Sequence, residues 1–414
     1  MTPTTRCAAV LAALAVVALV LPLWLTALAA GILLAATLAD GLSVRSAPVI
    51  ERDLSATVVR GIPSPFAVRA VAGDSRRVLL RQPATGALRV DAEAGPHELG
   101  GKIVGLRRGR HLLPGVSAAS LGPLGLARWQ HPPGAPLELL VYPDLPGARR
   151  LALRLRQGRA APDGRLRRGP LGLGTDFESL RDYSPDDDIR HVNWRATARL
   201  GRPMSNQYRV DQDRDVVFLI DCGRLMAAPA SEGAAGTLLD GALDAAIAVA
   251  MAADELGDHS GAIAFDGQVR RVVEPRRLGG RRLVRALFDL EPSDQDSDFE
   301  RAVLRMRGAR RTLVFVFTDL IDEQAARSLL DAAPVLARRH SVVVAGGEDP
   351  SLDALAAPAA PSAEAVAALS VLQARERTAL QIARTGAQLV LAPTRSLPQR
   401  CVQAYLRAKA RARL

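Results

Sequence analysis

The sequence predicts three structural parts in order: an N-terminal transmembrane helical hairpin, then a β-sandwich, then a doubly wound α/β domain. Three observations lead to this fold class. An uncharged apolar run comes first, short alternating segments broken by glycine and proline follow it, and apolar strands alternating with helices fill the C-terminal half. We expect a hairpin at residues 1–44, a sandwich at 45–160, a linker with a charged helix at 161–210, and the α/β domain at 211–414.

The composition argues against two classes of protein. The formal charge is +11, but Lys102 and Lys409 are the two lysines among 414 residues. Arginine this dominant, beside abundant alanine, glycine and leucine, indicates a composition bias rather than nucleic-acid binding, and no nucleic-acid-binding module is recognisable. The three cysteines, Cys7, Cys222 and Cys401, lie far apart without CxxC spacing. A disulfide framework and a cysteine metal site are therefore disfavoured.

The first element is the apolar run at residues 7–39, which contains no charged residue. A single span needs about 20 residues, so this run is too long for one span and long enough for two short ones. Pro22, near its middle, is a natural place for a tight turn. Arg6 precedes the run, and Arg45 and Arg52 follow it. The positive-inside rule then favours a hairpin in the inner (cytoplasmic) membrane with the soluble domains in the cytoplasm, over one tilted span.

The second element is a series of short segments in which apolar and polar residues alternate. Period-two segments with frequent turn residues are typical of an antiparallel β-sandwich. The expected strand regions are residues 55–61, 66–73, 76–82, 87–93, 102–120 and 137–143. None of them carries a catalytic motif.

The charged linker contains a dense block of carboxylates and arginines at residues 172–208. Aromatic residues are placed among these charges in a chain that is only 4% aromatic, which indicates a structured junction or interface. Ser184 is a good N-cap and Pro185 suits the first helical position, so we expect one helix that continues to Leu200 and stops at Gly201. Asp176, Arg181 and Tyr183 are expected to precede it in a turn.

Two interpretations of this block remain open. It is either a salt-bridged clasp between domains, with Trp194 as a buried structural residue, or a docking surface for a protein partner. Arginine, tryptophan and tyrosine are the residues that most often anchor protein interfaces. The candidate residues are Asp176, Phe177, Arg181, Tyr183, Asp187, Asp188, Arg190, Trp194 and Arg199.

The third element begins at Asp215, where DVVFLID predicts a buried parallel strand. A hairpin across Gly267 and further strands alternating with helices follow it, which predicts a sheet covered on both faces. Two strands end in aspartate, at Asp221 and Asp319. Because sheets of this kind bind ligands beyond the carboxyl ends of their strands, these two residues are candidates for a site.

The charged block together with the strand that ends at Asp221 resembles a bacterial family, domain of unknown function family 58. Its members carry a von Willebrand factor A-like domain and commonly accompany MoxR-type AAA+ ATPases. The nine candidate residues of the block match the family motif, whereas Asp186 stands where the motif commonly has glycine. The resemblance implies a membrane-anchored partner of such an ATPase, working in assembly or maturation of envelope or enzyme complexes.

The resemblance also implies a divalent-cation site of the type Asp-x-Ser-x-Ser, with a threonine and a second aspartate. Asp221 matches the first position, but Gly223 and Leu225 replace the two serines. Asp319 fits the second aspartate, and Ser297 could stand for the threonine. We therefore expect a degenerate metal site at Asp221, Ser297 and Asp319 that stays empty. No cofactor is expected, and Mg²⁺ is the ion that such oxygen ligands would suit.

These observations favour a non-enzymatic adaptor or scaffold. The sequence contains no GxSxG elbow, no HExxH and no Rossmann glycine motif after a strand. The expected partners are the MoxR-type AAA+ ATPase that the resemblance implies, protein clients, and the membrane. The alternative is a metal-dependent hydrolase acting at the sheet edge through Asp221 and Asp319.

Overall fold

In the computed structural model, the protein consists of two compact units, Met1–Tyr142 and Pro143–Leu414. The described residues are 1–71, 77–94, 97–143, 147–148, 150–151, 176–184, 192–209, 214–231, 236–306, 310–320, 323–357 and 362–411.

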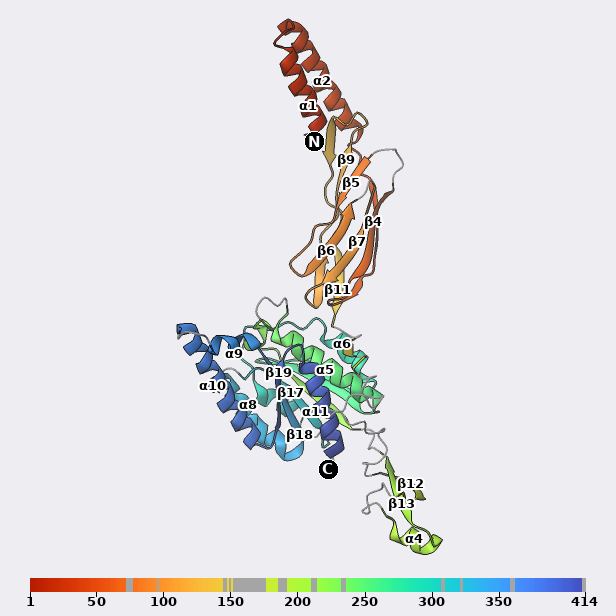
Figure 1. Ribbon diagram of the computed structural model, residues 1–414, viewed down its shortest axis with the longest axis vertical. Coiled ribbons are helices and arrows are strands. Elements are labelled where there is room, and N and C mark those ends of the chain that lie inside the picture. The colour runs from red at the N-terminus through yellow and green to blue at the C-terminus, as the bar shows by residue number, and fades with distance from the viewer. Residues whose placement is uncertain are drawn as a thin grey trace. The chain divides into compact units, whose positions relative to one another are not determined.

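The first unit starts with two antiparallel helices, α1 (Thr5–Val17) and α2 (Leu23–Ser43) (Figure 1). Pro22 is the N-cap of α2, so the predicted turn at this proline is confirmed. In the described part of the chain, one helix is long and apolar enough to cross a membrane, and it covers Trp24–Ser43. Helix α1 has 13 residues, fewer than the about 20 that a span needs. The prediction of a membrane-spanning segment is therefore supported for α2 alone.

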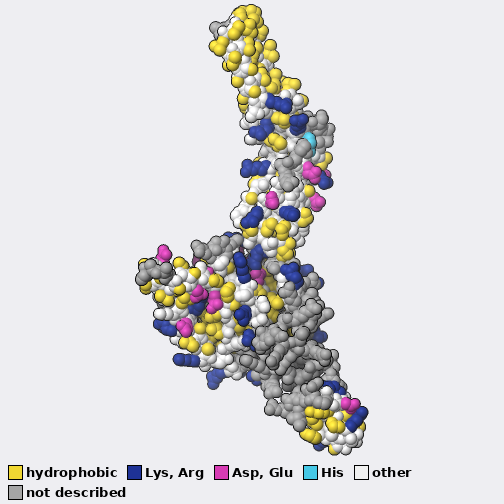
Figure 2. Space-filling model, viewed as in Figure 1, with side chains coloured by type: hydrophobic (Ala, Val, Ile, Leu, Met, Phe, Trp, Pro, Cys, Tyr) yellow, Lys and Arg dark blue, Asp and Glu magenta, His cyan; other side chains and the backbone are white. Residues whose placement is uncertain are grey.

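Both helices expose apolar side chains. Figure 2 shows them as a nearly continuous hydrophobic surface over α1 and α2. The most exposed of these side chains surround the turn between the two helices, including Leu19 (84%), Val20 (86%) and Trp24 (68%). Exposed apolar surface on this scale marks a membrane or protein interaction site.

Both ends of the helical pair are attached to one sheet. Strand β1 (Thr2–Pro3) pairs with β10 (Ala127–Gln130) just before α1 begins. Near the end of α2, the buried Asp40 carboxylate accepts hydrogen bonds from the backbone N–H groups of Leu124, Leu126 and Ala127 at 2.7–2.9 Å. A carboxylate in an otherwise apolar helix thus serves to fix that helix to the sheet.

The remaining strands of this unit are short, as their alternating sequences predict. They are β2 (Val49–Leu54), β3 (Thr57–Val59), β4 (Ser64–Val71), β5 (Arg77–Arg81), β6 (Leu88–Ala94), β7 (Glu98–Gly105), β8 (Gly109–Leu113), β9 (Ser117–Leu121) and β11 (Leu137–Tyr142). They form sheets in the orders β1-β10-β9-β5, β3-β11-β8 and β2-β4-β7-β6. Strands β2 and β10 lie outside the predicted strand regions.

All three sheets contribute to one hydrophobic core. Val78 of β5, Val141 of β11 and Ile103 of β7 are examples, each at most 3% exposed. The burial pattern of β5 alternates strictly between exposed and buried residues, as expected for strands with one face on a core.

The second unit contains a six-stranded sheet in the order β16-β15-β14-β17-β18-β19. Its strands are β14 (Asp215–Asp221), β15 (His259–Phe265), β16 (Val269–Arg277), β17 (Leu313–Phe317), β18 (Ser341–Glu348) and β19 (Gln388–Pro393). All neighbouring pairs are parallel except β15 and β16, which form the predicted antiparallel hairpin across Gly267. That prediction is confirmed.

Helices lie on both faces of this sheet (Figure 1). One group is α5 (Leu238–Glu255), α6 (Gly279–Leu287) and α11 (Leu397–Arg411). The other is α7 (Phe299–Arg305), α8 (Glu323–Arg339) and α10 (Ala363–Arg384). The predicted alternation of strands and helices is present, with the additional short elements η2 (Arg224–Ala227) and α9 (Pro350–Ala356) that the sequence did not suggest.

Strand β14 is buried on both faces, which explains its continuous apolar sequence. Leu219 packs in a core with Leu336 of α8 and Ile382 of α10. Phe218 points to the opposite face, where its ring lies 6.0 Å from that of Phe315 on the neighbouring strand. Burial of each such side chain contributes about 1.5–3 kcal/mol. The strand therefore fixes Asp221, its last residue, at a rigid edge of the sheet.

Candidate functional site

Three adjacent strands place an aspartate at the carboxyl edge of the six-stranded sheet. Asp221 ends β14, Asp266 directly follows β15, and Asp319 follows β17 after one threonine. Each of these residues is at most 6% exposed. Asp221 and Asp319 were predicted as candidates, whereas Asp266 was not, because it was assigned only to a hairpin turn. The signal that could have found it is its position after an apolar strand, like that of the other two.

Asp221 is the centre of a hydrogen-bond cluster. One carboxylate oxygen accepts from the Gly223 N–H (2.7 Å) and from the Ser297 hydroxyl, and the other accepts from the Thr318 hydroxyl (2.6 Å). Burial raises the pKa of Asp221, these three donors oppose the rise, and the charge of nearby Asp266 adds to it. Ser297 thus lies beside Asp221, as required of a candidate in the same site, and Thr318 is a further member that the sequence analysis missed.

The glycine at position 223 has a structural reason. A Cβ atom there would overlap the Ser297 hydroxyl and lie 2.9 Å from the Gln295 carbonyl oxygen. The oxygen that a serine side chain at 223 would bring to Asp221 is instead brought by Ser297 from the loop before α7. The hydrogen bond from Ser297 to Asp221 therefore requires a residue without a side chain at position 223.

Asp319 has a different partner. Its carboxylate accepts hydrogen bonds from the Leu320 N–H (2.7 Å) and from the Arg375 guanidinium (3.2 Å). The side chains of Arg375 and Asp319 are 7% and 2% exposed, so this is a buried ion pair. Arg375 also donates to the Gly347 carbonyl of β18 (3.4 Å). Arg375, which was not predicted as a site residue, thus connects α10 to the ends of two strands.

This arrangement does not fit a tightly bound divalent cation. A fixed guanidinium already holds Asp319, and the half-buried Leu225 offers no oxygen. In the part of the chain that the structure describes, no three His, Cys, Asp or Glu side chains are grouped so that they could hold a metal ion. The contacts that the structure shows at this edge are hydrogen bonds around Asp221 and the ion pair between Asp319 and Arg375.

We expect millimolar Mg²⁺ or Mn²⁺ to leave the melting temperature of the full-length protein unchanged. A ligand that binds only the folded state must stabilise it, so a bound ion would raise Tm by several degrees at about 100 times its Kd. Differential scanning calorimetry with and without metal measures this. Asp221→Ala is the control: a metal-dependent rise in Tm that this variant abolishes would contradict the prediction and locate the ion at Asp221.

The charged block forms a separate small module. Strands β12 (Asp176–Asp182) and β13 (Met204–Arg209) are antiparallel, and helix α4 (Trp194–Leu200) lies between them in sequence. Asn193 caps α4, since its side-chain oxygen accepts from the Ala196 N–H (2.9 Å) and its amide donates to Asn206 on β13 (2.8 Å). Gly201 ends the helix in the left-handed conformation (φ 69°), which confirms the predicted stop.

Two predictions about this block are wrong. Asp176 and Arg181 lie in a strand rather than in a turn, and a register shift between Phe177 and Ser179 explains why the sequence lacks clear period-two alternation. The helix does not run through Val192, which pairs with Ser205 in an isolated bridge, because Asn193 provides the cap. Ser184, the predicted cap, is described and lies in no helix, whereas residues 185–191, the predicted first turns, lie outside the described residues.

Trp194 is not the buried structural residue that the clasp interpretation requires. It is 68% exposed, and no residue of α4 is buried. Of the other candidates, Arg181 and Arg199 are exposed and Tyr183 is half-buried. The structure does not describe the side chains of Asp176 and Phe177. It does not describe any part of Asp187, Asp188 and Arg190. Within the described part of the chain, the candidates thus form a surface rather than a core.

One known protein family matches this part of the chain. The family model described as "Protein of unknown function DUF58" matches residues 179–388, which include β13, the aspartate edge and Arg375. No curated protein matches. A solved structure that is similar in part is the crystal structure of an uncharacterized membrane spanning protein from Vibrio fischeri, with 15% identity and a TM-score of 0.17 over 48% of this chain and 98% of that one. Because the family model matches half of the sequence, the chain belongs to the DUF58 family of proteins of unknown function.

Proposed function

We propose that this protein is a membrane-anchored, non-enzymatic adaptor that binds protein partners through the docking module formed by β12, β13 and α4. In this proposal the sheets of the first unit form a β-sandwich scaffold and the six-stranded sheet forms a von Willebrand factor A-like domain. The partner is an AAA+ ATPase of the MoxR type, and the process is assembly or maturation of envelope or enzyme complexes. The resemblance noted from the sequence supports these last two points.

The exposure of Trp194 is the observation that carries the proposal. A tryptophan that leaves 68% of its surface in solvent loses hydrophobic stabilisation, which a binding partner can restore by covering the ring. Tryptophan and arginine are also the residues most enriched among strong interface contacts. Leu200 (52% exposed) and Leu180 (39% exposed) add apolar surface to the same module.

Hydrogen bonds hold the module together although no residue of α4 is buried. Besides the Asn193 cap, the Met204 N–H donates to the Thr197 hydroxyl (3.1 Å), which joins α4 to the start of β13. A surface that is already ordered loses little conformational entropy when a partner binds. Arg195 and Arg199 are exposed on the helix, so a partner surface that combines carboxylates with an apolar pocket is complementary to it.

The N-terminal helices support the anchoring part of the proposal. Because β1 and Asp40 attach both ends of the helical pair to one sheet, insertion of α1 and α2 would leave the N-terminus and the first unit on the same side of the membrane. Arg6 and Arg45 flank the apolar region on that side. The positive-inside rule makes this side the cytoplasm.

The hydrogen bonds of the aspartate edge support a non-enzymatic role. A two-carboxylate hydrolase needs carboxylates that can hold a metal ion or an attacking water. Here both oxygens of Asp221 accept hydrogen bonds from the protein, and Asp319 is held by Arg375. We therefore assign the edge a structural role.

We expect Trp194→Ala and Arg199→Ala to weaken partner binding by more than about 1–2 kcal/mol while leaving folding almost unchanged, because both side chains are exposed. The measurement is the Kd between the full-length protein in detergent and the purified MoxR-type ATPase of the same organism, with Tm recorded for each variant. Val366→Ala and Arg377→Ala, exposed positions on α10, are the matched controls.

Three outcomes are decisive for this test. Weakened binding with unchanged Tm, confined to the α4 variants, supports the docking surface. Equal Kd values in all four variants exclude α4 as the docking site. A loss of affinity that only follows a loss of Tm restores the clasp interpretation.

A further inference from the structure

The turn between β16 and α6 presents an exposed apolar side chain among arginines. Its sequence is RRLGGRR, residues 276–282. Leu278 in this turn is 74% exposed and has a positive φ of 54°. The left-handed region is strained for a residue as bulky as leucine, and a strained backbone that persists is often part of a functional site. Because strain and exposure coincide at Leu278, we take this side chain as a candidate for binding something outside the chain.

The turn is fixed by the elements around it. Strand β16 ends beside the start of β15, and the Gly280 N–H donates a hydrogen bond to the Asp254 carboxylate near the end of α5 (3.0 Å). A Cβ atom on Gly279 would overlap the Ser260 carbonyl oxygen, so α6 can begin this close to β15 only with glycine at that position. The backbone on both sides of Leu278 is thus held by the fold while its side chain faces solvent.

This turn lies at the amino edge of the six-stranded sheet, where the parallel strands begin. Strand β16 is antiparallel to β15 and therefore ends there, and α8 and α10 return to the same edge before β18 and β19 start. Six strands about 4.8 Å apart make this edge roughly 24 Å wide. Further exposed arginines lie along it, namely Arg310 and Arg311 before β17, Arg338 and Arg339 at the end of α8, and Arg384 at the end of α10.

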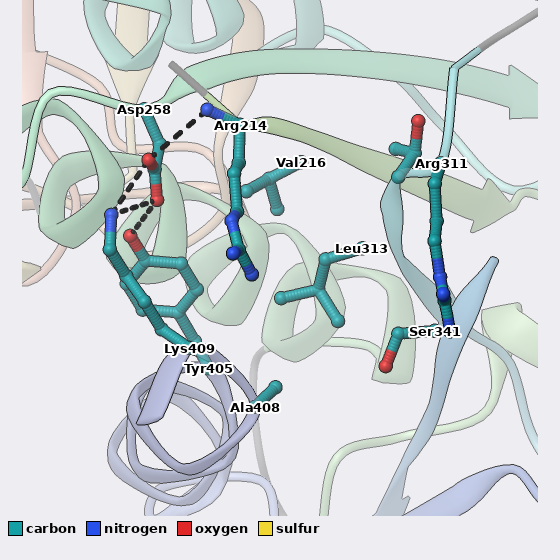
Figure 3. Close-up of a pocket in the computed structure, with 10 residues that line it drawn as sticks. Arg214, Val216, Asp258, Arg311, Leu313, Ser341, Tyr405, Ala408 and Lys409 are labelled. Carbon is teal, nitrogen blue, oxygen red and sulfur yellow. Dashed lines mark hydrogen bonds and ion pairs between the residues drawn. The ribbon is translucent and has the colours of Figure 1, made fainter. Parts of the chain in front are cut away.

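A buried acidic residue at this edge is already occupied by a cation. The Lys409 ammonium lies 2.7 Å from both carboxylate oxygens of Asp258, and their side chains are 6% and 1% exposed. The Tyr405 hydroxyl donates to the same carboxylate (2.5 Å). Figure 3 shows this group beside α11 and places Arg311 apart from it, on the other side of Leu313. Asp258 therefore does not offset the charge of the exposed arginines.

The helix dipole explains only part of this distribution of charge. Cations are favoured in the last turn of a helix, which accounts for the arginines that end α8 and α10. Arg281 and Arg282 lie in the first turn of α6, where the same dipole disfavours cations. Arg310 and Arg311 lie in a loop rather than in a helix. These four arginines are explained if the edge contacts an anionic surface.

We propose that the turn at residues 276–282 docks on the anionic phospholipid surface of the membrane that anchors the protein, with Leu278 inserted among the headgroups and Arg281 and Arg282 at the lipid phosphates. This inference rests on the proposed membrane anchoring, which keeps the second unit near the bilayer. Guanidinium groups match phosphate oxygens in geometry. Apolar side chains flanked by basic residues are typical of segments that lie in the membrane interface.

A bilayer fits this edge better than a small anion or an acidic protein segment. The arginines are spread along the edge rather than gathered around one point, and a bilayer presents many phosphates in one plane. A basic residue close to an anionic leaflet shifts the binding equilibrium by a factor of about five. Several such residues suffice for docking of a unit that its own anchor already holds at a high effective concentration.

The test places an environment-sensitive fluorophore on Leu278→Cys in the full-length protein, reconstituted in nanodiscs. Cys7, Cys222 and Cys401 are buried, so the introduced thiol is labelled selectively. The control label is on Leu355→Cys in α9, an exposed leucine (45%) away from the amino edge. The nanodiscs contain phosphatidylcholine alone or mixed with phosphatidylglycerol.

We expect a blue-shifted emission from the label at position 278 in nanodiscs with phosphatidylglycerol and not in neutral ones, and no shift from the control label. Arg281→Gln combined with Arg282→Gln should lower the ratio of docked to undocked protein roughly 25-fold, since each arginine contributes a factor of about five. Arg395→Gln combined with Arg400→Gln is the matched control. It removes the same charge from exposed positions after β19 and in the first turn of α11, and should change the ratio less than about twofold.

Several results would overturn the proposal. Equal shifts from the two labels, or in neutral and anionic nanodiscs, would exclude specific docking of the turn. Equal effects of the two arginine pairs would leave only diffuse attraction to a basic protein. A shift that appears only after addition of the MoxR-type ATPase would assign the turn to a protein interface instead.

The same nanodiscs separate this inference from the proposed anchor. Co-purification of the protein with both kinds of nanodisc, without a shift at position 278, contradicts the docking turn and leaves the anchor intact. Co-purification with anionic nanodiscs alone, together with the shift, supports the docking turn and contradicts the anchor. Failure to co-purify with either kind contradicts both. None of these variants alters α4, so the adaptor function is tested independently.

Discussion

Replacing Arg375 with methionine should lower the free energy of unfolding of the six-stranded sheet by about 3–5 kcal/mol, because it leaves the buried Asp319 carboxylate without its cation. Arg375 is 6% exposed and reaches both Asp319 and the Gly347 carbonyl. The variant also removes a connection between α10 and two strands. Native-state hydrogen exchange of the β17 and β18 amides in the full-length protein measures the loss locally.

Two further variants separate charge from packing. Arg377→Met, on an exposed position of the same helix, should change the exchange free energy by less than about 0.5 kcal/mol. The double variant Arg375→Met, Asp319→Asn should recover most of the loss, because a buried pair replaced on both sides no longer leaves an isolated charge. Equal destabilisation by the single and the double variant would show that Arg375 acts through packing rather than through the ion pair.

Much of the α/β unit could be predicted because local sequence and tertiary structure agree there. Strand β14 is apolar at every position between its two terminal aspartates and is buried on both faces, so its sequence alone indicates a central strand. The turn at Pro22 and the helix stop at Gly201 follow from backbone constraints on single residues. Such features depend on a few neighbouring residues, which is why one sequence suffices to find them.

The charged block could not be predicted in the same way. Its strand β12 contains a register shift and no apolar stripe, and its helix is stabilised by the Asn193 cap and by hydrogen bonds to β13 rather than by a buried face. An arrangement held by polar contacts leaves little hydrophobic periodicity in the sequence. The clasp interpretation required a buried Trp194, and the residues that could cover a side chain on a short helix cannot be identified from the local sequence.

The site residues that were not predicted escaped notice for the same reason. Thr318 and Arg375 join Asp221 and Asp319 across 97 and 56 residues of sequence, and no local pattern encodes a contact of that length. A weaker signal was present for Arg375. It lies on the buried stripe of α10 with Ala368, Thr378 and Ile382, at helical spacing, and a cation on such a stripe indicates a buried partner.

The other large effect is expected at the amino edge. Asp258→Asn should lower the free energy of unfolding by about 3–5 kcal/mol, because it leaves the Lys409 ammonium buried without its carboxylate. The substitution also removes the charge of the carboxylate that accepts a hydrogen bond from the Tyr405 hydroxyl. Tyr405 itself is 1% exposed. Burial and the charge of Asp258 both raise the pKa of Tyr405, so the hydroxyl remains a donor over the whole physiological range. Hydrogen exchange of the β14 and β15 amides measures the effect.

The control is Asp215→Asn, at the first residue of β14, which pairs with His259 at the start of β15. Asp215 lies 3.4 Å from the His259 ring nitrogen and is 33% exposed at its side chain, so its loss should cost less than about 1 kcal/mol. Asp258→Asn combined with Lys409→Met should recover most of the lost stability if the unpaired ammonium is the cause. If the double variant remains as unstable as Asp258→Asn, the Tyr405 hydrogen bond and the packing of α11 hold this edge together, and the ion pair contributes little.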